Sequence, residues 1–312
     1  MSETNNHHRE SKGIYNQFVR TIGQLAQQYE NLFPFVQLIP GLFWLLTFFG
    51  GAFGIVVVYS FLGQAPPADA VEFTVSNYAE FFADSFYFSI LVDSFVIGVK
   101  VTVVTLVIAY PVAYYLAFTK SDRRNLMVLF IIIPFWINIV IRTYAWRLIL
   151  GRNGVINYIL VDLVGVLSRP GNFLFSQNAI VLGLVYVFLP FMLLPVFTSL
   201  NRFDRRQIEA AQNLGANKIQ AFYEVTLPQS LSGVAGGVAI VFVLAFGSFV
   251  VPLLLGGPRN VMIANVIGEM FGRLQDWALG SAMAVTVTII SLLLVYTFNR
   301  VIGLDEVYGG GA

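Results

Sequence analysis

The sequence predicts an all-α integral membrane protein with about six transmembrane helices. Of its 312 residues, 57% are hydrophobic and only 11% are charged, whereas a soluble domain carries about 25% charged residues. Its mean hydropathy is +0.75. Because so little polar surface cannot cover a water-facing globule of this size, most of the exterior is expected to face lipid. Several uncharged stretches also exceed the length of about 20 residues that crosses a bilayer.

Six apolar stretches supply the predicted spans. Four of them contain no charged residue, at 31–68, 170–201, 225–258 and 277–299. Two more contain isolated charges, namely Lys100 in one, and Arg142 and Arg147 in the other. The first span starts too late and runs too long for a cleaved signal peptide, which predicts an uncleaved anchor. The spans are expected near residues 36–62, 94–118, 126–150, 177–200, 231–256 and 278–300.

The distribution of lysine and arginine predicts the orientation, because cytoplasmic loops carry an excess of these residues. Eleven of them lie before the first span, in the second-to-third loop, in the fourth-to-fifth loop or after the last span, against four in the opposite loops. Both termini are therefore expected to be cytoplasmic. The predicted organisation is a cytoplasmic tail at 1–35, a transmembrane domain at 36–303 with a cytoplasmic loop at 201–230, and a cytoplasmic tail at 304–312.

Composition also excludes several kinds of chemistry. The chain has no cysteine, which removes disulfides, thiol catalysis and cysteine-ligated metals. Its histidines, His7 and His8, lie in the polar N-terminal tail, where solvated side chains are expected rather than metal ligands. A net charge of +1 gives no reason to expect a nucleic acid partner. No Gly-x-x-x-x-Gly-Lys-Ser/Thr loop is present, so the chain is not expected to cradle ATP phosphates.

The fourth-to-fifth loop is patterned as a short amphipathic helix. Apolar residues recur there at spacings of three or four and form one stripe on an otherwise polar segment. Asp204 is placed to cap the start of the helix, Gly215 permits a bend, and Pro228 is expected to end the helical run. A helix lying on the membrane surface would give the same pattern. The stripe consists of Ile208, Ala211, Gly215, Ile219 and Phe222.

The residues of this loop resemble the EAA loop of ABC importer permeases. Glu209-Ala210-Ala211 is followed at the family spacing by Gly215 and then by Val225-Thr226-Leu227-Pro228. The resemblance implies a type I (MetI-like) permease fold, in which this segment, Phe222 included, is a coupling helix docked into a groove of an ATPase subunit. The two alanines permit close approach, and Glu209 can accept hydrogen bonds or an ion pair at the docking surface.

From about residue 36 onward, the chain most resembles the spermidine/putrescine permeases of the PotB and PotH type. The similar segments lie at 134–146, 183–192 and 256–282. The resemblance implies a bacterial inner-membrane subunit that is not itself an enzyme and binds no cofactor. It also implies a second related permease, in a heterodimer rather than a homodimer, two ATPase subunits that bind ATP and Mg²⁺, and an extracytoplasmic solute-binding protein.

Charges in or beside the spans are expected to lie near the outer interface. Lys100 and Arg147 are expected to snorkel to headgroups. Arg142 is expected to brace an outer gate by pairing with a carboxylate, either Asp93, Glu269 or Asp276. A passage for polyamines should combine carboxylates with aromatic faces, which attract cations. The candidate path residues are Arg142, Tyr144, Trp146, Tyr186, Glu269, Asp276 and Trp277, although aromatic residues also favour lipid interfaces.

Other functions remain open at this point. An ABC permease could instead carry an opine, an amino-acid-like solute or an inorganic anion. A secondary transporter coupled to protons or sodium would place ionisable groups near the bilayer midplane, yet the first, fourth, fifth and sixth spans have no charged residue. A membrane enzyme would need a nucleophile and base or a metal constellation, and the sequence displays neither.

Overall fold

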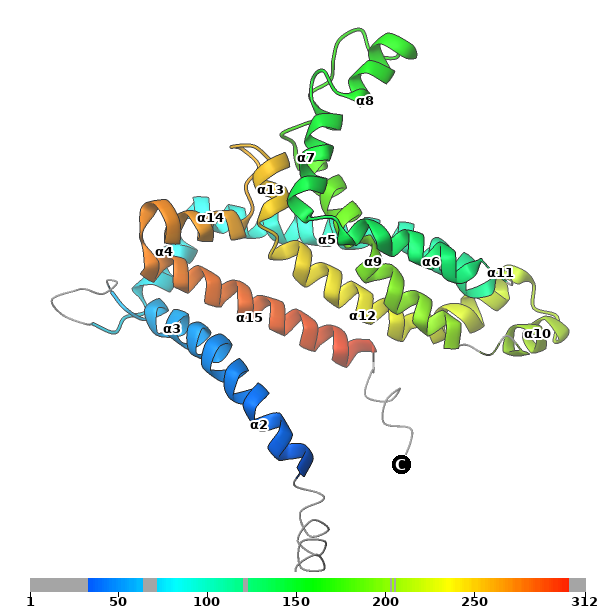
Figure 1. Ribbon diagram of the computed structural model, residues 1–312, viewed down its shortest axis with the longest axis horizontal. Coiled ribbons are helices and arrows are strands. Elements are labelled where there is room, and N and C mark those ends of the chain that lie inside the picture. The colour runs from blue at the N-terminus through cyan, green and yellow to red at the C-terminus, as the bar shows by residue number, and fades with distance from the viewer. Residues whose placement is uncertain (1–32, 64–71, 120–122, 203, 205, 303–312) are drawn as a thin grey trace, which may run out of the picture. The chain divides into compact units, whose positions relative to one another are not determined.

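The computed structural model describes residues 33–63, 72–119, 123–202, 204 and 206–302 (Figure 1). The predicted tail at 304–312 and all but the last three residues of the tail at 1–35 lie outside them, as do His7 and His8. The chain divides into two compact units, residues 1–58 and 59–312. Within the described ranges the secondary structure is helical, apart from one isolated bridge between Leu62 and Phe73.

The described helices confirm the predicted fold class. Five are long and apolar enough to cross a membrane, and a sixth crossing results if one bent pair counts as a span. The first unit contains α2 (Phe33–Leu45), the π-helical turn η1 (Leu46–Gly50) and all but the last two residues of α3 (Gly51–Ser60), which form an apolar stretch that contains Pro40. The five long helices are Leu38–Ser60, Ser85–Phe118, Gln177–Arg202, Lys218–Phe246 and Trp277–Phe298.

Three helices form the centre of the second unit: α5 (Ser85–Phe118), α9 (Gln177–Arg202) and α12 (Leu227–Phe246). They pack side by side, and α15 (Trp277–Ile302) lies along α12 (Figure 1). A core of fully buried aliphatic side chains joins them, including Val101, Leu184, Met192 and Val241. Because lipid is as apolar as these side chains, close packing rather than hydrophobic exclusion holds such helices together.

Small residues allow α9 and α12 to approach closely. A Cβ atom added at Gly233 would lie 2.6 Å from the backbone oxygen of Pro195, and one at Gly237 would lie 2.7 Å from the sulfur of Met192. These two glycines are four residues apart, so they lie on one face of α12, as in the small-xxx-small pattern of membrane helix pairs. The absence of side chains at both positions is therefore what allows this contact.

The third predicted span, 126–150, is not one straight helix. It is split into α6 (Arg124–Ile132), the 3₁₀ turn η2 (Ile133–Trp136) and α7 (Ile139–Leu150), with a bend of 92° at the break. Pro134 lies in the 3₁₀ turn, and Asn138 has non-helical backbone and accepts a hydrogen bond from the Val140 amide at 2.8 Å. Asn138 is thus the N-cap of a new helix, which hydropathy alone does not reveal. Beyond α7 follow α8 (Val155–Asn157) and η3 (Tyr158–Leu163).

The fifth span also differs from its predicted bounds of 231–256. Helical structure begins earlier, at Lys218, and α12 ends at Phe246 before the short helix α13 (Val250–Leu255). Pro228 therefore lies at the start of α12 and does not end the helical run. The π-helical turn η4 (Phe222–Thr226) precedes it. Such single π-helical turns occur within otherwise α-helical segments, where they locally replace the regular hydrogen bonds.

Three shorter elements lie near the N-terminal end of α5. They are α4 (Ser76–Ala83), α14 (Ile263–Glu269) and the π-helical turn η5 (Met270–Leu274). Buried Ser94 on α5 accepts a hydrogen bond from the Ile263 amide at 2.8 Å. This bond ties the start of α14 to α5.

Candidate functional site

The EAA-like loop folds as two short helices joined by a turn. Helix α10 covers Arg206–Asn213 and α11 covers Lys218–Ala221. Asp204 accepts a hydrogen bond from the Arg206 amide at 3.0 Å, so the predicted cap is confirmed. The single amphipathic helix expected through Phe222 is wrong, because the chain leaves the helix at Gly215 and starts again after Asn217.

Gly215 ends α10 in a Schellman motif. Its φ is +98°, its amide donates to the carbonyl of Gln212, and the next amide, of Ala216, donates to the carbonyl of Ala211. This pair of hydrogen bonds satisfies carbonyls that the helix end would otherwise leave unpaired. Left-handed backbone is available to glycine without the steric cost of a Cβ atom. The predicted bend at Gly215 is therefore a defined turn.

Glu209 and Ala210 face outward from α10, whereas Ala211 is half-buried. Beside them lies a surface hollow of about 360 Å³, lined by Ala211, Leu214, Gly215, Ala216, Gln220 and Glu224. Leu214 is 90% exposed. An exposed apolar side chain next to small residues and carboxylates is suited to docking against another protein.

Phe222 connects the EAA-like loop to the transmembrane helices. Its ring packs edge-on against Tyr110 and Tyr114 of α5, with ring centres 5.9 and 5.8 Å apart. The Tyr110 hydroxyl in turn lies 2.9 Å from the Ser230 hydroxyl on α12. Displacement of α10 and α11 would therefore act directly on α5 and α12. Leu227 and Pro228 are the first residues of α12.

A second link joins α10 to α12 through two amide side chains. Gln229 donates a hydrogen bond to the side chain of Gln207, which lies in α10. Together with the Phe222 contacts, this bond anchors the EAA-like loop on both sides of its turn.

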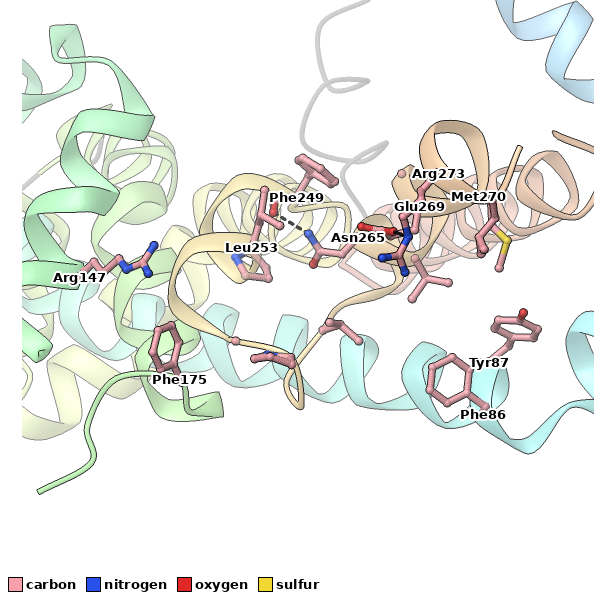
Figure 2. A pocket seen from close by; sticks show the side chains of 17 residues that line it. Phe86, Tyr87, Arg147, Phe175, Phe249, Leu253, Asn265, Glu269, Met270 and Arg273 are labelled. Atoms are coloured by element: carbon pink, nitrogen blue, oxygen red, sulfur yellow. Dashed lines mark hydrogen bonds and ion pairs between the residues drawn. The ribbon is translucent and has the colours of Figure 1, made fainter. Parts of the chain in front are cut away.

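A cavity of about 710 Å³ lies at the other end of α5 (Figure 2). Phe86 and Tyr87, from the first turn of α5, line it, whereas Phe222 of the EAA-like loop contacts the same helix at Tyr110 and Tyr114. The other lining side chains come from α7, α13, α14 and the connections beside them, and include Arg147, Phe175, Phe249, Asn265, Glu269 and Arg273.

The cavity combines aromatic faces with one ion pair. Glu269 accepts from the Arg273 Nε at 3.1 Å, and both side chains are exposed. The Asn265 side chain donates to the carbonyl of Phe249 at 2.9 Å and accepts from the Met262 amide at 3.1 Å, which holds α14 against the break after α12 (Figure 2). A carboxylate among aromatic rings can attract an organic cation.

The predicted path residues do not gather in one place. Of the seven, only Glu269 lines the cavity. Asp276 accepts from the Leu279 amide at 3.0 Å and so caps α15, and Trp277 packs on Phe271. Trp146 packs edge-on against Tyr186 at 5.7 Å, and exposed Tyr144 lies 6.0 Å from the guanidinium of Arg147.

The prediction that Arg142 pairs with Asp93, Glu269 or Asp276 is wrong. Its guanidinium lies over the ring of Phe135 at 4.9 Å, and it forms no ion pair with a described Asp or Glu. Glu269 is paired with Arg273 instead, and Asp276 serves as a helix cap. The break before α7 accounts for this, because it redirects the arginine from its expected position. Of the expected snorkelling cations, Lys100 donates to the Gln177 side chain at 2.9 Å, and Arg147 lies beside the Phe175 ring.

Several cavity residues were not identified from the sequence. Phe86, Tyr87 and Phe249 could not be singled out among 29 phenylalanines and 14 tyrosines. Asn265 could have been identified, because an amide side chain in an apolar stretch must find hydrogen-bond partners when it is buried.

The apolar helical bundle with its exposed EAA-like loop is the architecture of a membrane-embedded transport permease. Residues 12–304 match the family described as the binding-protein-dependent transport system inner membrane component, and the chain belongs to this family. The spermidine/putrescine transport system permease protein PotB of Salmonella typhimurium (strain SL1344) is 38% identical over 226 residues, 72% of this chain and 78% of PotB. PotB of Haemophilus influenzae is 35% identical over 231 residues, 74% of this chain and 80% of that protein.

Solved structures with the same fold belong to a bacterial ABC transporter that imports the acidic polysaccharide alginate. One chain superimposes with a TM-score of 0.70 at 16% identity, covering 90% of this chain and 98% of that chain. A second structure, in complex with an alginate pentasaccharide-bound periplasmic protein, gives a TM-score of 0.64 at 17% identity over 88% and 96%. At these identities, the likeness establishes the fold.

Proposed function

We propose that this chain is one permease subunit of an ABC importer for polyamines, coupled to a separate ATPase through α10. The observation that carries the coupling role is the Schellman-ended helix α10, which displays Glu209 and Ala210 outward at the EAA spacing. The family membership supports an importer assembly with an inner-membrane location. In this assembly, ATP and Mg²⁺ are bound by the ATPase subunits and both termini of this chain are cytoplasmic.

Coupling then follows from the contacts of the short helices. An ATPase that closes on nucleotide pulls on α10, with Glu209 bonded at the docking surface and Ala210 and Ala211 allowing close contact. Phe222 transmits this motion to α5, and the Gln207–Gln229 bond transmits it to α12. Because packed helices move as rigid elements between discrete arrangements, the bundle opens alternately to each side. A second, related permease forms the other half of the path, and an extracytoplasmic solute-binding protein delivers the substrate.

Polyamines are supported as substrates by the PotB relatives and by the chemistry of the cavity. A polyamine is a flexible chain of ammonium groups. The cavity offers one exposed carboxylate, Glu269, and several aromatic rings, including those of Tyr87 and Phe249. Arg273 and Arg147 lower its attraction for cations, which suits a transit site, since tight binding would stall release. Most of the binding energy and selectivity is assigned to the solute-binding protein.

Uptake by the reconstituted complex tests the substrate and the cavity together. In proteoliposomes with the cognate ATPase, partner permease and solute-binding protein, radiolabelled putrescine and spermidine should accumulate only with ATP. Glu269→Gln should lower uptake at subsaturating substrate about fivefold, because one charge pair in water at contact distance contributes about 1 kcal/mol. Glu80→Gln, an exposed carboxylate that does not line the cavity, is the matched control.

The polyamine substrate and the role of the cavity are tested by different outcomes. Absence of uptake of either polyamine by the unmodified complex would remove the substrate assignment and leave the permease class intact. Normal uptake by the Glu269→Gln variant would remove the cavity from the path.

A further inference from the structure

Arg142 is a buried cation that has no acceptor among the residues that the structure describes. The residue is 8% exposed, and its Nε and Nη1 atoms are fully enclosed without a hydrogen-bond partner in the described part of the chain. A buried charge is normally paired and hydrogen-bonded, because leaving it unpaired costs several kcal/mol. Among the described residues, this site therefore lacks its anion.

The surroundings of Arg142 do not replace that anion. The guanidinium lies 4.9 Å from the ring centre of Phe135 and 6.0 Å from that of Tyr186. Aromatic faces attract a cation, but they do not take up the in-plane N–H groups of a guanidinium, which fit a carboxylate. Arg142 is thus partly stabilised by the rings and left with unused donors.

The surface around Arg142 is strongly apolar. Trp136, in the turn before α7, is 89% exposed, and Tyr186 is exposed at the rim beside Trp146. The 92° break directs α7 away from the line of α6, so these side chains are not covered by described parts of the chain. Further exposed apolar residues on α6, η2 and α7 are Leu129, Phe130, Ile133, Val140, Ile141 and Leu148.

We propose that this surface, from Leu129 to Leu148, is the docking face for the second permease subunit, which inserts a carboxylate between Phe135 and Tyr186 to pair with Arg142. The Phe135 and Tyr186 rings part to admit the carboxylate to the enclosed Nε and Nη1 donors, which supply the charge complementarity, and the apolar rim supplies the surrounding contact area. A carboxylate on a side chain is small enough to reach an arginine that is 8% exposed, whereas a lipid phosphodiester is bulkier. The proposal rests on the two-permease assembly proposed above.

The pairing predicts opposite effects of one substitution in two states of the protein. In the subunit purified alone, Arg142→Met removes an unpaired charge, so its thermal unfolding temperature should equal or exceed that of the unmodified subunit. In the complex, the same change leaves the partner's carboxylate unpaired. The dissociation constant for the partner permease should then rise about 30-fold or more, the effect of truncating one member of a buried charge pair. Arg142→Lys should be intermediate.

Arg152→Met, which removes an exposed arginine beyond α7, is the control and should leave assembly unchanged. A second readout uses the absence of native cysteine in this chain. Tyr186→Cys should form a disulfide with single cysteines placed beside one acidic residue of a cysteine-free partner permease within the intact complex.

Unchanged partner affinity in Arg142→Met would overturn the proposal, as would the lack of any such disulfide. A lower unfolding temperature of Arg142→Met alone, seen only in bicelles containing anionic phospholipid, would assign the site to a lipid headgroup instead. Polyamine uptake is not a readout of these assays, so their failure is distinct from failure of the proposed function.

Discussion

Gly215→Val is expected to lower nucleotide-driven uptake about five- to thirtyfold while the protein still inserts and folds in the membrane. The φ of +98° at this position costs about 1–2 kcal/mol for a residue with a side chain. A local penalty of that size lowers the population of the native turn about five- to thirtyfold. The Schellman bonds to Ala211 and Gln212 are then lost, and α10 no longer presents Glu209 in its docking orientation.

A graded series at Gly215 separates backbone strain from crowding. A Cβ atom there would meet nothing within 4 Å, so steric contact contributes little. Uptake and ATPase association should therefore decrease in the order glycine, asparagine, alanine, valine, because asparagine tolerates left-handed backbone best among the substitutes. Equal uptake by the valine variant, measured in the same proteoliposomes, would mean that the turn has no role in coupling.

Gly233→Leu is expected to prevent stable packing of α9 against α12. Even a Cβ atom at this position would lie 2.5 Å from the Cβ of Ser199 and 2.6 Å from the backbone oxygen of Pro195. Because the backbone of α9 cannot yield locally, the helices must separate. The cost should reach about 3 kcal/mol or more, the upper range for overpacked interiors. Fluorescence-detected size exclusion and thermal unfolding in detergent would measure it.

Gly236→Leu is the matched control for this prediction. It introduces the same side chain into the same helix, but a Cβ atom at Gly236 meets nothing within 4 Å. Its unfolding temperature should remain close to that of the unmodified protein. A similar loss of stability in both variants would show that leucine disturbs α12 itself and not its contact with α9.

The fold class and the cap and turn of the EAA-like loop were accessible from the sequence because they depend on local patterns. Uncharged apolar stretches predict membrane helices, and the spacing from Glu209 to Pro228 predicts a docking segment. Asp204 and Gly215 could be interpreted correctly, since caps and left-handed turns depend on residue type. The break after Trp136 was missed although Pro134 and Asn138 mark it, because a hydropathy window does not register a cap inside an apolar run.

The environment of the path residues could not be predicted in the same way. Arg142 was assigned a carboxylate partner by its expected depth along a straight helix, and the bend invalidates that depth. Glu269 lines the cavity as a member of the predicted path, whereas Asp276 is occupied as a cap of α15. These outcomes depend on how α7, α13 and α14 pack against α5, and spacing within one element carries no information about such packing.

The central claim, that α10 docks onto a separate ATPase, can be tested by cross-linking through Ala210→Cys. The chain has no native cysteine, so the reagent would react at one known position of an exposed helix. In the assembled complex, the account predicts a cross-link from residue 210 to the ATPase subunit that changes in yield when ATP is added, and no such cross-link from Asn153→Cys. Cross-linking of residue 210 to the solute-binding protein, or uptake by complexes lacking the ATPase, would contradict it.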